Sequence, residues 1–222
     1  MSSMPCPSLQ AVVFDMDGVL VDTEPLHYAT ACALVAPAEL PMSEYERFIG
    51  THGFGVWLHE TYDIPPDVIR QRSSELFFEQ LDADGLKPMP GVHAVLDAIR
   101  ERGLATAVVT MTQPDWTEAT LSAAGLRDRF EVVVTVRDVE HGKPAPDLYL
   151  HAAERLDVDP RCALAFEDSV HGVASAVAAG MQTIQLRQAT YVPEAQPTAH
   201  AVIGRFADFD AGWLDRGVPN GR

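Results

Sequence analysis

Two aspartates near the start of the chain are the residues best suited to chemistry. Within AVVFDMDGVLVDTEP, residues 11–25, Asp15 and Asp17 follow an apolar run that is typical of a strand buried on both faces. Gly18 permits a chain reversal directly after them. Open α/β sheets bind ligands at the carboxyl ends of their strands. The pattern therefore predicts a ligand site around these two carboxylates.

Paired carboxylates favour a cation and phosphoryl transfer. Two adjacent carboxylates repel each other, and both stay ionised when a positive charge lies between them. Mg²⁺ prefers oxygen ligands and commonly binds a substrate phosphate as well. One carboxylate could attack phosphorus while its neighbour handles a proton. By itself, however, Asp-x-Asp-Gly is equally typical of an ordinary turn or a calcium loop, so other residues must decide.

The second half of the chain alternates between helical and strand patterns. After the first strand at 11–14, strands are predicted at residues 104–110, 132–135, 163–166, 183–186 and 201–203. Helices are predicted at residues 92–103, 114–124, 146–156 and 170–179, with a further helix beyond residue 206. This alternation predicts an α/β fold with a parallel, doubly wound sheet.

A helical segment separates the first strand from this alternating region. Residues 24–35 are alanine-rich, Pro25 suits a first helical position, and the helical character continues to about residue 81. Pro65 and Pro66 precede a predicted helix at residues 67–81, and residues 82–91 have the composition of a linker. We therefore expect a helical insertion between the first strand and the rest of the sheet.

Polar residues follow three later strands of the predicted sheet. Thr110 and Thr112 follow one strand, and Lys143 lies in HGKPAPD after the next. Glu167 and Asp168 end a third strand in AFEDS. The carboxyl ends of parallel strands lie at one edge of the sheet, so these side chains can converge with the first two aspartates.

The converging residues match the needs of phosphoryl transfer. Asp15 is the candidate nucleophile, and Lys143 and Thr110 are candidate donors to the phosphoryl oxygens. Asp17 can protonate the leaving oxygen and then deprotonate a water, and the acidic pair at 167 and 168 completes a cation site. Each residue also has a structural interpretation, as a helix cap, a surface lysine or a first-turn acid, but these interpretations do not explain four clusters at successive strand ends.

The four motifs together resemble a known family. DMDGVLVDTEP, the Thr110 strand end, GKPAPD and FEDS, in this order, resemble the motifs of the haloacid dehalogenase superfamily. SVHGVASAVAAGM is similar to its β-phosphoglucomutase-like branch, which carries a helical cap. The resemblance implies a Rossmann-like core at residues 1–18 and 89–222 and an α-helical cap domain at residues 19–88. It also implies an aspartyl-phosphate on Asp15 and Mg²⁺ bound by Asp15, the Asp17 backbone carbonyl and Asp168, with Glu167 nearby.

Within this family, the expected activity is a Mg²⁺-dependent phosphatase acting on a small phosphorylated metabolite such as a sugar phosphate. A sugar phosphomutase of the β-phosphoglucomutase type is the alternative, and a phosphometabolite-binding sensor is the non-enzymatic one. The segment FIGTHGFG, residues 48–55, offers His52 but no Lys or Arg for a second phosphate, which favours the phosphatase. His27, His52 and Thr112 are the candidate substrate residues, although a histidine like His27 is equally typical of a helix near a hinge.

Composition narrows the classes of partner. The 222 residues carry a formal net charge of −16, which opposes binding to nucleic acid or an anionic membrane. No apolar run approaches the roughly 20 residues of a membrane span, and the first residues do not resemble a signal peptide. Cys6, Cys32 and Cys162 form no CxxC pair, so we expect reduced thiols. We therefore expect a cytoplasmic monomer whose partner is a small phosphorylated substrate.

Overall fold

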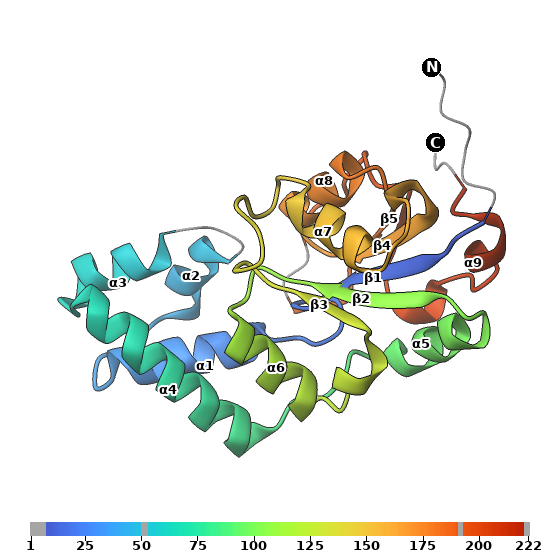
Figure 1. Cartoon of the computed structure of the whole chain (residues 1–222). Coiled ribbons are helices and arrows are strands. Elements are labelled where there is room, and N and C mark those ends of the chain that lie inside the picture. The colour runs from blue at the N-terminus through green and yellow to red at the C-terminus, as the bar shows by residue number, and fades with distance from the viewer. Residues whose placement is uncertain (1–7, 50–52, 191–192, 220–222) are drawn as a thin grey trace. The chain divides into compact units, whose positions relative to one another are not determined.

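The computed structural model describes residues 8–49, 53–190 and 193–219. The chain divides into two compact units, one formed by Met1–Asp22 with Lys87–Arg222 and the other by Thr23–Leu86. The second unit interrupts the first between two of its strands (Figure 1). That residues 19–88 act as a cap stays a prediction.

The first unit contains a six-stranded sheet in which every neighbouring pair is parallel. Its strands are β1 (Ala11–Asp15), β2 (Ala105–Val109), β3 (Val132–Val134), β4 (Ala163–Glu167), β5 (Gln182–Leu186) and β6 (Ala201–Ile203). They are arranged in the order β3-β2-β1-β4-β5-β6, so β1 lies between β2 and β4 in the middle of the sheet (Figure 1). The predicted Rossmann-like α/β fold is confirmed.

Helices of the first unit cover both faces of this sheet. They are α5 (Val92–Glu101), α6 (Pro114–Ala123), α7 (Asp147–Arg155), α8 (Val170–Ala178) and the short α9 (Trp213–Arg216), with the 3₁₀ turns η2 (Arg127–Arg129), η3 (Pro160–Cys162) and η4 (Phe206–Asp208). Figure 1 shows α7 and α8 on one side of the sheet and α5 on the other. In the described residues beyond 206, where we expected one helix, the chain forms the η4 turn and the short helix α9.

Side-chain size differs between the two faces. Ala11, Val13 and Ala165 belong to the face that packs against α7 and α8, where small side chains allow the helices to approach closely. The opposite face carries Phe14 and Phe166, whose rings stack with centroids 5.1 Å apart. The pleat of each strand therefore assigns its alternate residues to two different cores, and it also decides which way the last residue of the strand points.

The second unit is entirely helical among its described residues. It consists of α1 (Glu24–Val35), α2 (Met42–Tyr45), η1 (Glu46–Phe48), α3 (Phe54–Tyr62) and α4 (Pro66–Asp84). Pro25 and Pro66 occupy first-turn positions of α1 and α4, where the missing N–H is tolerated. Helix α4 continues to Asp84, three residues past the predicted end, so the first residues of the expected linker are helical. Leu58 and Tyr45 lie in the core of this unit.

One expectation about the cysteines is wrong. Cys32 is free, but Cys162 is disulfide-bonded. The Gln10 N–H donates to the Cys162 carbonyl oxygen at 2.8 Å, so the segment before β1 lies beside this cysteine. Such proximity comes from the tertiary fold and cannot be inferred from cysteine spacing.

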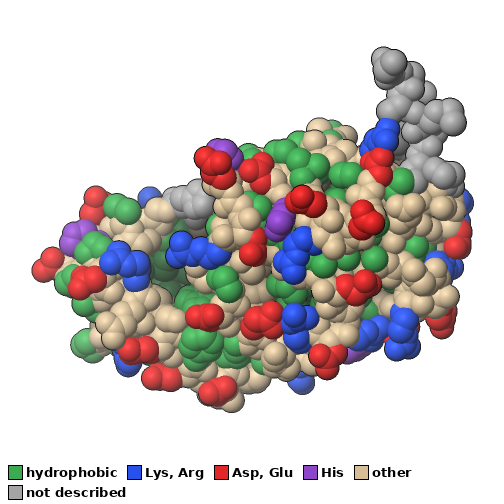
Figure 2. Space-filling view, viewed as in Figure 1, with side chains coloured by type: hydrophobic (Ala, Val, Ile, Leu, Met, Phe, Trp, Pro, Cys, Tyr) green, Lys and Arg blue, Asp and Glu red, His purple; other side chains and the backbone are tan. Residues whose placement is uncertain are grey.

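The described surface carries charged side chains of both signs as well as a few exposed large hydrophobic ones. None of the helices that the structure describes is both long and apolar enough to span a membrane. On the face shown in Figure 2, Lys and Arg side chains are interspersed with Asp and Glu side chains.

Candidate active site

The pleat of two neighbouring strands directs two carboxylates to the same side of the sheet. Side chains alternate along a strand, so Asp15 shares a face with Val13, and Glu167 shares a face with Ala165. Because β1 and β4 pair in parallel, both acids end their strands at the same edge of the sheet. Glu167 is fully buried and Asp15 is only 6% exposed. The core face that packs against α7 and α8 thus ends in two buried carboxylates.

Lys143 supplies the positive charge between these carboxylates. Its Nζ lies 2.6 Å from Glu167 Oε1, forms an ion pair with Asp15 Oδ1, and approaches the Val109 carbonyl oxygen at 3.5 Å. Lys143 lies in the loop that precedes α7 and is buried, like the acids that it contacts. The chain has only one other lysine, Lys87, so one of its two lysines is buried at this site.

Tyr149 is a site residue that the sequence reasoning missed. Its hydroxyl donates to Glu167 Oε1 at 2.6 Å, and the Lys143 ammonium lies 5.5 Å from the centroid of its ring. Tyr149 is completely buried in α7. In the sequence it has the spacing of an ordinary core residue of an amphipathic helix, and only the polar hydroxyl of a buried tyrosine, which needs a partner, could have indicated its role.

The backbone at the start of α8 fixes the second oxygen of Glu167. Oε2 accepts from the Asp168 N–H at 3.2 Å, from the Ser169 N–H at 3.4 Å and from the Ser169 hydroxyl at 3.3 Å. Gly172 leaves room for this carboxylate, because a Cβ at that position would lie 2.0 Å from its atoms. Protein donors therefore surround both oxygens of Glu167, which indicates a carboxylate that orients other groups.

Asp17 is held by the two threonines that follow β2. Asp17 Oδ2 accepts from the Thr110 hydroxyl at 3.0 Å and from the Thr112 hydroxyl at 2.8 Å. The Thr112 N–H in turn donates to Thr110 Oγ1 at 3.0 Å. Sequence reasoning assigned Thr110 and Thr112 to the phosphoryl group and the substrate, whereas in this structure both hydroxyls bind the second aspartate.

The acidic residues at this edge fit a divalent cation. Carboxylate oxygens of Asp15, Glu167 and Asp168 lie within 4.8 Å of one another. Gly18 has a φ of +80°, and a Cβ there would lie 2.1 Å from Asp168 Oδ2, so the glycine makes room for that carboxylate. Together with Asp17, four carboxyl groups lie at this edge of the sheet beside one ammonium group, that of Lys143. A hard cation would neutralise the excess negative charge.

Burial and the crowding of charges also shift the pKa values of Asp15, Asp168 and Lys143. Burial raises the pKa of Asp15 well above its ordinary value, and Glu167 and Asp168 raise it further, while Lys143 acts in the opposite direction. Burial and the charge of Glu167 likewise raise the pKa of Asp168. Burial lowers the pKa of Lys143, but the attraction of Asp15 and Glu167 outweighs it, so the net shift is upward and the ammonium stays charged.

The two candidate histidines belong to the second unit. His27 lies on α1, and its ring stacks on Phe77 of α4 with centroids 5.7 Å apart. His52 lies outside the described residues. Their predicted role in substrate binding stays a prediction.

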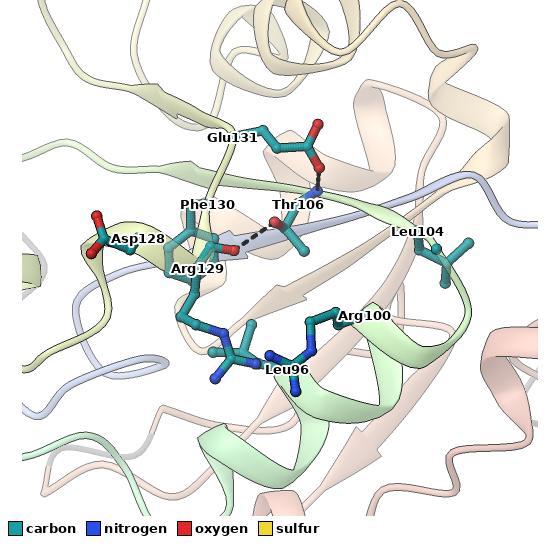
Figure 3. Close-up of a pocket in the computed structure, with 9 residues that line it drawn as sticks. Leu96, Arg100, Leu104, Thr106, Asp128, Arg129, Phe130 and Glu131 are labelled. Carbon is teal, nitrogen blue, oxygen red and sulfur yellow. Dashed lines mark hydrogen bonds between the residues drawn. The ribbon is translucent and has the colours of Figure 1, made fainter.

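A cavity of about 410 Å³ lies elsewhere in the first unit. Thr106, near the amino end of β2, lines it together with Arg100 and Arg129 (Figure 3). Both arginines form ion pairs with Asp97. The acidic cluster lies at the carboxyl ends of the strands, so this cavity is separate from the candidate active site.

Comparison with known proteins agrees with this geometry. Residues 9–180 match the family model of haloacid dehalogenase-like hydrolases. The fructose-1-phosphate phosphatase YqaB of Escherichia coli (strain K12) is 32% identical over 184 residues, which cover 79% of this chain and 95% of YqaB. A phosphatase of phosphorylated carbohydrates from Thermotoga maritima is 32% identical over 187 residues, which cover 79% of this chain and 84% of that protein. The crystal structure of CbbY from Rhodobacter sphaeroides with phosphate superposes with a TM-score of 0.78 at 26% identity, covering 90% of this chain and 96% of CbbY.

The fold is a parallel α/β sheet with paired acids at its carboxyl edge and a buried lysine beside them. The chain belongs to the haloacid dehalogenase-like hydrolase family, and its relatives place it among the phosphatases of that family, the hydrolases of phosphoric monoesters. The resemblance seen in the four sequence motifs is thereby confirmed.

Proposed function

We propose that this protein is a Mg²⁺-dependent phosphatase of a small phosphorylated metabolite, with a sugar phosphate as the substrate class. The observation that carries the proposal is that two aspartates have different partners. Asp15 is buried against Lys143, and Asp17 is held by two threonine hydroxyls. This arrangement provides a nucleophile and a separate proton donor at one edge of the sheet. The activities of the relatives on fructose 1-phosphate and phosphorylated carbohydrates support the substrate class.

In the first half of the reaction, Asp15 attacks the substrate. A carboxylate oxygen of Asp15 forms a bond to phosphorus while the bond from phosphorus to the ester oxygen breaks. Asp17 donates a proton to the departing oxygen, so the product leaves as an alcohol. Lys143 neutralises negative charge beside Asp15 and the phosphoryl oxygens.

In the second half, water releases phosphate. Asp17, now a carboxylate, accepts a proton from water while the water oxygen bonds to phosphorus. The bond between phosphorus and Asp15 breaks, inorganic phosphate leaves, and both aspartates return to their starting states.

The acidic cluster supports the metal assignment. Asp15, Asp168 and the backbone carbonyl of Asp17 would hold Mg²⁺, with Glu167 adjacent, and the ion would neutralise charge on the phosphoryl oxygens during transfer. Tyr149 and the start of α8 hold Glu167, which in turn fixes the Lys143 ammonium near Asp15.

Phosphate release from a panel of sugar phosphates tests the function. We expect the wild-type protein to release inorganic phosphate from at least one member of the panel without a sugar bisphosphate activator. Isomerisation that depends on such an activator would instead support a phosphomutase. Binding without turnover would support a phosphometabolite sensor.

The nucleophile is tested with Asp15→Asn. The amide keeps the shape of the side chain but is a poor nucleophile, so we expect at least a 1,000-fold loss of kcat, on the order of what removing a catalytic nucleophile costs. Ser122→Ala, an exposed change on α6, is the control that should retain activity. A substantial residual rate in the Asn variant would contradict the assignment.

A further inference from the structure

Thr112 lies two residues beyond the candidate phosphate-binding Thr110, yet its hydroxyl is directed to Asp17. It donates to Asp17 Oδ2 at 2.8 Å, and the Thr110 hydroxyl donates to the same oxygen at 3.0 Å. The Thr112 N–H donates to Thr110 Oγ1 at 3.0 Å, which closes a small network of three hydrogen bonds. One carboxylate oxygen is thus held from two directions by neighbouring residues of one loop.

The number of protons available limits what these two threonines can do. A threonine hydroxyl has one proton to donate. When Thr110 gives its proton to a phosphoryl oxygen, it can no longer give it to Asp17. Of the two threonine hydroxyls, only that of Thr112 then still holds Asp17 Oδ2. The loop therefore contains one hydroxyl to bind the phosphoryl group and a second to hold Asp17 at the same time.

We propose that Thr112 is the positioning residue of the acid/base aspartate, holding Asp17 in place while Thr110 binds the phosphoryl group. This inference rests on the proposed phosphatase function and assigns Thr112 a role other than substrate contact. Thr112 acts through Asp17, so its contribution is to proton transfer and not to affinity. A general acid that is poorly placed loses part of the 10²–10⁴-fold acceleration that proton transfer typically supplies.

Thr112→Val tests the proposal, since valine keeps the branched shape and lacks the hydroxyl. Two substrates separate the roles: 4-nitrophenyl phosphate, whose phenolate departs without a proton, and the alkyl sugar phosphate that the wild type hydrolyses fastest. Because kcat/KM reports the steps up to departure of the leaving group, we expect it to fall about 10- to 100-fold for the alkyl ester. For the aryl ester the fall should be less than about threefold.

Affinity for inorganic phosphate provides the second readout. A positioning role leaves the inhibition constant of inorganic phosphate within about twofold of wild type. Equal losses on both esters, together with about tenfold weaker inhibition by phosphate, would show direct substrate contact and overturn the proposal. Thr112→Ser restores the hydroxyl and should recover most of the activity on the alkyl ester. Failure of the serine variant to recover activity would also overturn it.

A double-mutant cycle tests whether Thr112 acts through Asp17. In an Asp17→Asn background, measured with 4-nitrophenyl phosphate and with the alkyl ester, adding Thr112→Val should cost less than about twofold, because the group that it positions is gone. An added loss as large as in the wild-type background would overturn the proposal. If wild-type protein hydrolyses neither ester, the phosphatase function itself fails, and the role of Thr112 fails with it. Normal hydrolysis by the wild type and by Thr112→Val alike overturns only the role of Thr112.

Discussion

At the residue scale, Glu167 shows how a buried charge is tolerated. Its Oε1 contacts the Lys143 ammonium and the Tyr149 hydroxyl, and its Oε2 contacts the backbone at the start of α8. A buried carboxylate without such partners would be strongly destabilising. The same contacts that compensate for its burial also fix the position of Lys143, so stability and the proposed catalysis depend here on one set of hydrogen bonds.

Tyr149→Phe separates the hydroxyl from the ring. Phenylalanine keeps the packing beneath the Lys143 ammonium but removes the donor to Glu167 Oε1. Loss of a buried hydrogen bond to a charged group costs about 1.5–3 kcal/mol, so we expect a free energy of unfolding lower by that amount. With Lys143 and Glu167 less well held, kcat should fall about tenfold. Urea unfolding and phosphate release measure the two effects.

The comparison for this variant is Tyr149→Leu, which removes the ring as well. It should destabilise more than the phenylalanine variant, because aromatic packing is lost in addition to the hydrogen bond. Equal stability of wild type and Tyr149→Phe would contradict the role of the hydroxyl.

At the element scale, close approach of α8 to β4 depends on a missing side chain. Gly172 lies in the first turn of α8, where a Cβ would lie 2.0 Å from the Glu167 carboxylate. That carboxylate is held on both oxygens and cannot move aside without breaking its contacts. The packing of α8 against β4 therefore requires glycine at position 172 opposite the carboxylate of Glu167.

Gly172→Ala should accordingly destabilise the first unit. We expect a loss of about 1–3 kcal/mol in the free energy of unfolding, as for overpacking in a core, and a lower kcat as Glu167 is displaced. Gly55→Ala on α3 is the matched control, since its Cβ would have only Ile69 Cγ2 near it, at 4.0 Å. At that exposed position, alanine should be neutral or stabilise by up to about 1 kcal/mol. Equal effects of the two changes would refute the steric argument.

Elements with a strong local pattern were the easiest to predict. The continuous apolar run that ends at Asp15 is typical of a fully buried strand, and the apolar residues of α5 recur at helical spacing. Both elements occur where expected. Near the carboxyl terminus the chain instead follows tertiary contacts: Phe206 and Phe209 pack on Phe166, and only short helical turns form around them. Local sequence could not reveal this, because the contacts connect residues far apart in the chain.

At the scale of the whole molecule, the contacts between the charged residues of the site are what the sequence did not predict. Sequence patterns predicted that the acids and Lys143 follow strands of the sheet. They did not predict which hydrogen bonds each side chain makes. The contacts of Tyr149 and Gly172 with Glu167 depend on how α7 and α8 lie on the sheet. Such interlocking follows from packing between elements, and composition and periodicity carry no information about it.

Mg²⁺ should stabilise the folded protein. Asp15, Glu167 and Asp168 bring negative charge together, so a cation that binds the folded chain alone shifts unfolding by mass action. At a Mg²⁺ concentration about 100 times its Kd, the gain is about 2.7 kcal/mol. We expect a higher Tm with MgCl₂, no such rise with NaCl of equal ionic strength, and loss of both activity and added stability with EDTA.

Asp168→Asn is the variant that isolates the cluster in this measurement. It removes one charge from the proposed ligand set and should reduce the Mg²⁺-dependent rise in Tm, while Asp208→Asn, at an exposed position of η4, should not. A rise in Tm that is identical in both variants would place the cation elsewhere.

The central position of β1 in the sheet has a consequence for how the enzyme is made. Ala11 pairs with Ala105 on one side and with Ala163 on the other, so neither neighbour of β1 exists until much of the chain has been synthesised. Contacts between such distant segments form slowly, because long loops must close first. The strand that carries Asp15 is thus synthesised before either of its neighbours, and it has both partners only once β4 has been made. In a growing chain, the proposed nucleophile therefore stays unassembled until β4 has been made.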